Sequence, residues 1–379
     1  MKTFDTLIKK YSKGNTLFIV GPNMEELGIE SGMFLGLSIF DNEIRKSNLH
    51  GKFDSIFMMD PKLSKRNNNE TIIAELIRFL KKDGVIILHL KKTYHSSVWG
   101  MKAFIMTRSF DNPKLLSQDV ISQNESIVEI SLKRQIKSNK NWSIGIPSNG
   151  LRNPSILKLI KSIYEARNYI RLKKGVNIEI DIMLIGEKDK LFKDYPIRYF
   201  QQSLPKNLNA LGEKKFIITT NAAYENILII HDRYVLDESF FIGFEEWGYD
   251  FEFCTVQQYD LEGNVFDPIL TLEETGRFDR QMYRVKDQSY PYKHLYISGG
   301  LIIIKKMVTD YVNFDPFLLQ NESEDIDFAF RAGVHGITAQ FNSISIARTF
   351  TPLETSNIAV VPFVPEIKGL MTLFRFRRW

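Results

Sequence analysis

The segment His231-Asp232-Arg233 places an imidazole, a carboxylate and a guanidinium directly after the apolar run Ile227 to Ile230. Such a run is typical of a buried strand, and unpaired charges are costly to hold near a core. In an open α/β sheet, ligands bind where the carboxyl ends of the strands meet. The segment therefore predicts a site at the end of this strand, and a local cluster of salt bridges is the alternative interpretation.

A second acidic cluster, Glu322-Ser323-Glu324-Asp325-Ile326-Asp327, follows about ninety residues later. This separation fixes no distance, but it suits two strand or loop ends that meet at one cleft. Together the two clusters indicate an enzyme that acts on a phosphorylated, metal-bound substrate. The acids could equally form the first turn of a helix, where the helix dipole stabilises negative charge.

The composition is that of an ordinary globular protein. Of 379 residues, 44% are hydrophobic and 25% are charged, and the length exceeds the usual span of one hydrophobic core. The net charge of +5 comes from scattered lysines, so no nucleic-acid partner is expected. The single cysteine, Cys254, excludes a disulfide framework and a multi-cysteine zinc site. The N-terminus lacks a long apolar segment and no apolar run is long enough to span a membrane, so we expect a cytoplasmic protein.

Strand-like and helix-like segments alternate along the chain, and the pattern restarts after the polar, linker-like stretch 134–141. This order predicts an α/β protein of two Rossmann-like domains, 1–138 and 139–350, followed by a basic and aromatic tail, 351–379. The first domain is predicted to contain strands over 16–20, 34–40, 53–59, 85–90 and 126–133 and a helix over 70–82. The second is predicted to contain strands over 142–147, 178–185, 215–219, 227–230 and 251–259 and a helix over 153–169.

Residues that follow strands of the second domain form an ordered series. They are Pro147-Ser148-Asn149 after Ile146, then Glu187, then Asn221-Ala222-Ala223 ahead of the strand that ends at His231. This series resembles family-two-type glycosyltransferases of the GT-A fold. In that family one strand ends Ile-Pro-Thr-x-Asn, an acidic residue follows the second strand, and an Asp-x-Asp motif follows an apolar strand.

The downstream half continues the resemblance. It contains Gly299-Gly300, the turn Phe314-Asp315-Pro316-Phe317, and Glu324-Asp325-Ile326-Asp327 followed by Arg331 and Gly333. The order is similar to the galactosyltransferase-like C-terminal half of such enzymes, and the resemblance covers residues 142 to 340.

The resemblance implies an inverting glycosyltransferase of the hexosyltransferase type, which moves a sugar from a nucleotide sugar, a UDP-sugar above all, to a glycan or lipid-linked glycan. Asp325 would be the catalytic base, and Glu324 would bind the acceptor or orient the loop. The residues implied in nucleotide-sugar binding are Pro147, Ser148, Asn149, Glu187, Asn221, Arg233, Gly299 and Gly300.

The metal motif departs from the family pattern. The Asp-x-Asp acids are replaced by His231 and Arg233, and only Asp232 between them is acidic. Either Asp232 and His231 hold a divalent cation, Mn²⁺ or Mg²⁺, or Arg233 replaces the metal at the diphosphate. We expect the first of these alternatives.

The first domain carries the segment 53–60 and then a helix that ends at Gly84 before the apolar run 85–88. This resembles the fourth strand, helix and fifth strand of class I S-adenosylmethionine (SAM) methyltransferases, and Asp41 lies where an acid would meet a ribose. The glycine-rich loop is replaced by Gly21-Pro22-Asn23-Met24, in which proline lacks an N–H and side chains crowd the cofactor. We expect a degenerate domain that does not bind SAM. The alternatives are a SAM-dependent methyltransferase with a glycan-binding accessory domain and a non-catalytic assembly protein.

The tail mixes apolar and basic residues: Leu370, Met371, Leu373, Phe374, Arg375, Phe376, Arg377, Arg378 and Trp379. This mixture fits a short interfacial segment on the anionic inner face of a membrane, which would make the protein peripheral there. The simpler alternative is a segment that packs on the second domain or on a second subunit.

Overall fold

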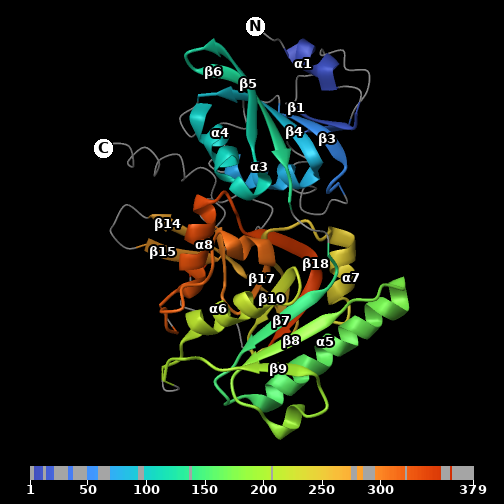
Figure 1. The fold of residues 1–379 in the computed structure, drawn as a ribbon, viewed down its shortest axis with the longest axis vertical. Coiled ribbons are helices and arrows are strands. Elements are labelled where there is room, and N and C mark those ends of the chain that lie inside the picture. The colour runs from blue at the N-terminus through green and yellow to red at the C-terminus, as the bar shows by residue number, and fades with distance from the viewer. Residues whose placement is uncertain are drawn as a thin grey trace.

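The computed structural model describes residues 4–11, 14–20, 33–36, 49–58, 69–92, 98–135, 139–205, 208–274, 280–284, 295–320, 322–350 and 359–360. The protein is α/β, as predicted, and its two larger sheets lie one above the other in Figure 1. Residue 138 lies between the last strand of one sheet and the first strand of the other. That the two parts are separate domains stays a prediction. The predictions for Gly21 to Met24, for Asp41 and for the tail 351–379, apart from residues 359–360, concern residues outside the described ones.

The first sheet has the strand order β2-β1-β3-β4-β6-β5. Its first four strands in this order run parallel, β6 is antiparallel to β4, and β5 is antiparallel to β6. The elements are α1 (Phe4–Tyr11), β1 (Thr16–Val20), β2 (Met33–Gly36), β3 (Phe53–Met58), α3 (Asn69–Phe79), β4 (Leu80–Lys91), α4 (Val98–Thr107), η3 (Ser109–Asp111), β5 (Lys114–Ser122) and β6 (Glu125–Lys133). Both faces are covered, because Leu17 and Ile19 pack on the side of α3 and α4 while Phe18 packs against Leu7 of α1.

The helix predicted over 70–82 ends three residues early. It stops at Phe79, and β4 starts at Leu80. Residues 81–84 continue the strand, since Asp83 pairs with Lys133 and Gly84 with Leu132. Pairing with a neighbouring strand gives these backbone groups the hydrogen bonds that a cap would have supplied.

The second sheet has nine strands in the order β11-β18-β12-β17-β10-β7-β8-β9, with β13 paired to β12. The strands β9, β8, β7 and β10 are parallel, and β17 is antiparallel to β10. The strands are β7 (Trp142–Pro147), β8 (Ile180–Ile185), β9 (Ile197–Phe200), β10 (Asn226–Ile230), β11 (Tyr234–Leu236), β12 (Phe253–Asp260), β13 (Val265–Phe266), β17 (Leu301–Lys305) and β18 (Gln340–Thr349).

Helices cover both faces of the second sheet. They are α5 (Asn153–Lys174), α6 (Leu211–Asn221), α7 (Phe240–Trp247) and α8 (Glu324–Val334), with short turns η4 (Lys190–Phe192) and η5 (Lys306–Asp310). Leu228 and Ile230 of β10 pack in the core that α5 and α7 cover, whereas Ile227 and Ile229 pack in the core beneath α6 and α8. The apolar run therefore forms a strand that is buried on both sides, as predicted.

The strand predicted over 215–219 is wrong, because these residues belong to helix α6. A short apolar run does not distinguish a strand from a buried helix. The sheet keeps the helix close, since a Cβ at Gly145 of β7 would lie 2.2 Å from Cγ2 of Ile218. This close packing matters for the site, because α6 carries Lys214 and Lys215.

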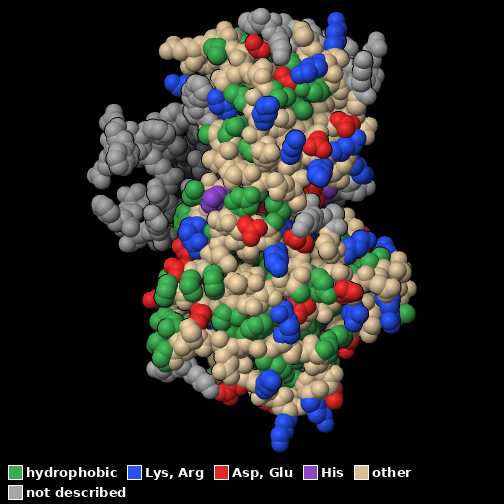
Figure 2. All heavy atoms as spheres, in the orientation of Figure 1, with side chains coloured by type: hydrophobic (Ala, Val, Ile, Leu, Met, Phe, Trp, Pro, Cys, Tyr) green, Lys and Arg blue, Asp and Glu red, His purple; other side chains and the backbone are tan. Residues whose placement is uncertain are grey.

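A smaller sheet joins β16 (Leu295–Ile297), β14 (Ile269–Glu274), β15 (Arg280–Arg284) and β19 (Ala359–Val360) in that order. Within the described part of the chain, no helix is long and apolar enough to cross a membrane. Figure 2 shows basic and acidic side chains interspersed over the visible face.

A buried group of charges joins the first sheet to the second. It comprises three arginines and four carboxylates, and we call it the seam cluster: Arg78, Arg108, Arg134, Glu75, Asp111, Asp250 and Glu252. Arg108 donates to Asp111 at 2.7 Å and to Glu252 at 2.5 Å, and Arg134 donates to Asp250 at 2.6 Å. Arg134 begins the stretch predicted to be a linker, so at least this residue of the stretch is buried structure rather than a tether.

Candidate functional site

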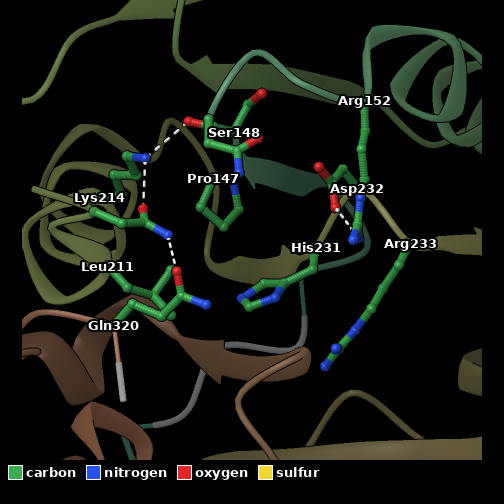
Figure 3. Close-up of a pocket in the computed structure, with 11 residues that line it drawn as sticks. Pro147, Ser148, Arg152, Leu211, Lys214, His231, Asp232, Arg233 and Gln320 are labelled. Carbon is green, nitrogen blue, oxygen red and sulfur yellow. Dashed lines mark hydrogen bonds and ion pairs between the residues drawn. The ribbon is translucent and has the colours of Figure 1, made fainter. Parts of the chain in front are cut away.

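The carboxyl ends of β7 and β10 open onto one pocket. The two strands are parallel neighbours, with Gly145 paired to Ile229, so Pro147 at the end of β7 lies beside His231 after β10. The pocket encloses about 170 Å³, and Figure 3 shows the side chains around it. Its lining comprises Pro147, Ser148, Asn149, Arg152, Asn209, Leu211, Lys214, His231, Asp232, Arg233 and Gln320.

Three cations and one carboxylate line this pocket, and we call Arg152, Lys214, Arg233 and Asp232 the pocket cluster. Arg152 Nη1 lies 3.5 Å from Asp232 Oδ1. Lys214 Nζ donates to the Ser148 carbonyl at 2.8 Å and to Asn209 Oδ1 at 3.0 Å. Burial lowers the pKa of Lys214 and raises the pKa of Asp232, although the nearby arginines oppose the shift at Asp232.

The surroundings of His231 disfavour the charged form of its imidazole. Burial lowers its pKa well below the usual value, and the surrounding cations Lys215, Arg233, Lys214 and Arg152 lower it further. Its Nε2 atom is buried and has no hydrogen-bond partner among the described residues. A buried imidazole of this kind is a polar group aimed at a ligand, because leaving it unpaired is costly.

Gly299 and Gly300 connect the pocket to the second predicted cluster. His231 donates its backbone N–H to the Gly300 carbonyl at 2.9 Å, and Gly299 donates its N–H to Asp325 Oδ2 at 2.7 Å. A Cβ at Gly300 would lie 2.8 Å from Arg233 Nη2, and one at Gly299 would lie 3.0 Å from Asp325 Oδ2. Gly299 and Gly300 are consecutive, and their Cα atoms are about 3.8 Å apart. Arg233 Nη2 and Asp325 Oδ2, which each lie close to one of these glycines, are therefore within about 13 Å of each other.

Glu324, Asp325 and Asp327 of the acidic cluster lie in the first turn of α8, as the helix alternative predicted. Lys215 Nζ donates to Glu324 Oε1 at 2.7 Å and to the Gly299 carbonyl at 3.0 Å. Burial raises the pKa of Asp325; the Lys215 ammonium opposes this shift and the Glu324 carboxylate adds to it. Ser323 precedes the pair with φ of 60°, a backbone conformation that is strained for serine.

Some predicted site residues lie elsewhere. Asn221 ends α6 beside the start of β10, and its amide donates to the Ile217 carbonyl, so it is at the opposite end of the strand from His231. Glu187 follows β8 on the correct edge of the sheet but is exposed and does not line the pocket. Asp327 pairs with Arg331 on the surface of α8.

Several residues of the site were missed from the sequence. Arg152, Lys214 and Lys215 supply most of its positive charge, and Asn209 and Gln320 complete one wall. Arg152 had a usable signal, because it directly precedes the predicted helix after Pro147-Ser148-Asn149. The two lysines were hidden by the wrong strand assignment, which gave no reason for adjacent buried ammonium groups.

The described residues do not fit the expected divalent cation. No group of three or more His, Cys, Asp or Glu side chains among them could hold a metal ion. Asp232 is the one carboxylate of the pocket lining, and it is paired with Arg152. Hard divalent cations favour several oxygen ligands, and a pocket lined by three cations is unfavourable for another positive charge.

Comparisons with known proteins give only loose likenesses. No protein-family model matches the chain, and the curated proteins give no match. Among solved structures, TarS 1–349 of S. aureus aligns with TM-score 0.35 at 10% identity, over 56% of this chain and 58% of that one. Drosophila β1,4-galactosyltransferase 7 with xylobiose aligns with TM-score 0.35 at 8% identity, over 63% and 82% of the two chains. GalNAc-T7 with UDP, GalNAc and Mn²⁺ aligns with TM-score 0.40 at 11% identity, over 59% and 46%.

The aligned part is thus little more than half of the TarS fragment, and the scores are too low to carry an activity to this chain.

Proposed function

We propose that the protein is a glycosyltransferase of the hexosyltransferase type, which transfers a sugar from a UDP-sugar to a glycan or lipid-linked glycan. One observation carries the proposal. A cation-rich pocket at the strand ends adjoins a half-buried carboxylate, Asp325, and Gly299-Gly300 lies between them in contact with both. The order of these motifs in the sequence supports the same reading.

The pocket is the proposed binding site of the nucleoside diphosphate. Backbone and side chains of Pro147, Ser148 and Asn149 form the wall that would face the nucleoside, and Arg233 would face the diphosphate. Arginine suits this role because its planar guanidinium donates two parallel hydrogen bonds to a phosphate. Gly299 and Gly300 let the side chains of Asp325 and Arg233 approach the backbone closely, since a Cβ would lie 3.0 Å from Asp325 Oδ2 at Gly299 and 2.8 Å from Arg233 Nη2 at Gly300.

Asp325 is the proposed base. Its carboxylate would accept the proton of the acceptor hydroxyl while the acceptor oxygen bonds to the anomeric carbon and the bond from that carbon to the diphosphate breaks. A raised carboxyl pKa suits this task, because a base works best when its pKa approaches the working pH. A single base that activates the acceptor for in-line attack inverts the anomeric configuration.

The proposal includes a cytoplasmic location. A tail at the inner face of a membrane would suit a lipid-linked acceptor. No step of the proposed reaction passes through a metal ion. A SAM-dependent methyltransferase would depend on the loop from Gly21 and on Asp41, outside the described residues, and no observation in the described residues favours it.

The test is a transfer assay with a panel of UDP-sugars and glycan acceptors, run on the full chain. Asp325→Asn should abolish transfer and leave UDP binding intact, because Asp325 acts on the acceptor. Asp310→Asn, an exposed aspartate in η5, is the matched control and should transfer normally. If the wild-type chain binds no UDP-sugar and no UDP in any buffer, the proposal is wrong.

A further inference from the structure

The pocket cluster carries more positive than negative charge. Arg152, Lys214 and Arg233 contribute three cations, and Asp232 contributes one carboxylate. The lysine and arginines therefore leave an excess of positive charge at the strand ends. A bound group with several negative charges would complete this balance, since charges in a partly enclosed site interact strongly.

Arg233, like Lys214, is a cation of this cluster that has no carboxylate partner within the described residues. No ion pair to Arg233 is present within the described residues, and its Nε atom is buried without a hydrogen-bond acceptor. Its Nη2 atom reaches the Gly300 backbone, on the side toward Asp325. A buried N–H without an acceptor is costly, so Nε of Arg233 is a donor whose hydrogen bond a ligand would satisfy.

Asp232 behaves differently from a metal ligand. Its carboxylate lies against Arg152, which comes from the loop between β7 and α5, and Lys214 lies on the opposite side of the pocket (Figure 3). A divalent cation would have to displace Arg152 and sit among the remaining cations. The second expected donor, His231, adds a single nitrogen to this set.

We propose, resting on the proposed function, that the donor diphosphate is bound and neutralised as it leaves by Arg233 with Lys214 and Arg152, without a divalent metal ion. Arg233 donates to the phosphate oxygens, and Lys214 and Arg152 supply further charge from the two sides of the pocket. Asp232 holds Arg152 in place and opposes the diphosphate rather than binding it through a metal. The expectation of a cation bound by Asp232 and His231 is thereby replaced by its alternative.

Calorimetric titration of the full chain with UDP, in EDTA and then in Mn²⁺, tests this directly. The dissociation constant should change less than about threefold between the two buffers, and inorganic pyrophosphate should compete with UDP in EDTA. Arg233→Gln should weaken UDP binding in EDTA about tenfold or more, since a charge-assisted bidentate contact is lost. Arg171→Gln, an exposed arginine in the last turn of α5, is the control and should bind UDP as the wild type does.

Asp232→Asn gives the sharpest contrast, because a metal-free site and a metal site predict opposite changes in the affinity for UDP. Removal of a carboxylate that repels the diphosphate should leave UDP binding in EDTA as tight or make it a few-fold tighter. A metal site would lose its acidic ligand, and binding in Mn²⁺ would collapse. A thermal melt of each variant shows that it is folded.

The outcomes separate the two proposals. UDP that binds only in Mn²⁺, with loss of binding in Asp232→Asn, overturns the metal-free site and leaves the glycosyltransferase proposal standing. Failure to bind UDP and every UDP-sugar in either buffer overturns both.

Discussion

The seam cluster and the pocket cluster both gather arginines and carboxylates, yet they differ in balance and enclosure. In the seam cluster three arginines meet four carboxylates, and Arg108 and Arg134 are almost fully enclosed. In the pocket cluster three cations meet one carboxylate at the edge of a cavity. Closed, matched charges hold parts of a protein together, whereas unmatched charges beside a cavity indicate ligand binding.

The shifts of pKa follow the same division. Burial lowers the pKa of Arg134, but the carboxylates of Asp250, Asp111 and Glu252 outweigh it and hold that pKa above its usual value. In the pocket, burial lowers the pKa of Lys214, and the carboxylates of Asp232 and Glu213 only partly offset this shift. The seam thus stabilises its own cations, while the pocket holds a cation that still lacks sufficient negative charge.

The largest effect is expected at the seam. Arg134→Met removes a cation from among buried carboxylates and should lower the free energy of unfolding by about 3–5 kcal/mol, because uncompensated buried charge is left behind. Urea denaturation of the full chain measures this, with Arg171→Met as the exposed control. A loss below about 1 kcal/mol would show that the seam is not a matched, enclosed cluster.

Gly299→Ala should come next, and its effect should appear in catalysis. The added Cβ would lie 2.9 Å from Lys215 Nζ and 3.0 Å from Asp325 Oδ2, so the base must shift. We expect kcat to fall about 100-fold, as small misplacements of catalytic groups can do. Gly333→Ala in α8 is the matched control, because a Cβ there meets nothing within 4 Å. Equal kcat in the two variants would contradict the proposed place of Asp325.

Lys215→Met should move the pH dependence of kcat. Asp325 must be ionised to act as the base, so kcat should fall as pH drops through its raised pKa. The Lys215 ammonium lowers that pKa, so its removal should shift the acid limb of the profile to higher pH. A profile of kcat against pH at saturating donor measures the shift, and an unmoved or downward-shifted limb would argue against Asp325 as the titrating base.

The smallest effect is expected for Arg233→Met on the free energy of unfolding. This variant is the counterpart in the pocket cluster of Arg134→Met in the seam cluster. Because Arg233 lacks an ion-pair partner within the described residues, its removal leaves no carboxylate uncompensated. The free energy of unfolding should change by less than about 1 kcal/mol, in either direction. Denaturation in the absence of nucleotide measures it, and a loss as large as that for Arg134→Met would place Arg233 in a structural network.

The sequence predicted the parts of the fold that local pattern controls. The run Ile227 to Ile230 forms a strand buried on both faces, and the helix predicted over 153–169 forms as α5, Asn153–Lys174. The strand predicted over 215–219 was wrong, because a short apolar stretch suits helix and strand alike. The burial of Arg134 was missed for another reason. Its partners Asp250 and Glu252 lie more than a hundred residues away, so the residues around Arg134 in the sequence give no sign of them.

The same limit applies to the site. Asp232, Arg233 and Asp325 could be selected because they follow strands or lie in an ordered series of motifs. Lys214 and Lys215 could not, because their roles depend on how closely α6 packs on Gly145 and on the register that brings Gly300 beside His231.

The most direct test of the account is a crystal structure of the full chain grown with UDP in EDTA. We predict the diphosphate against Arg233 and Lys214 at the carboxyl ends of β7 and β10, with its outer phosphate toward Gly299 and Asp325. UDP bound at the strand ends of the first sheet, or a pocket left without nucleotide at saturating UDP, would contradict it.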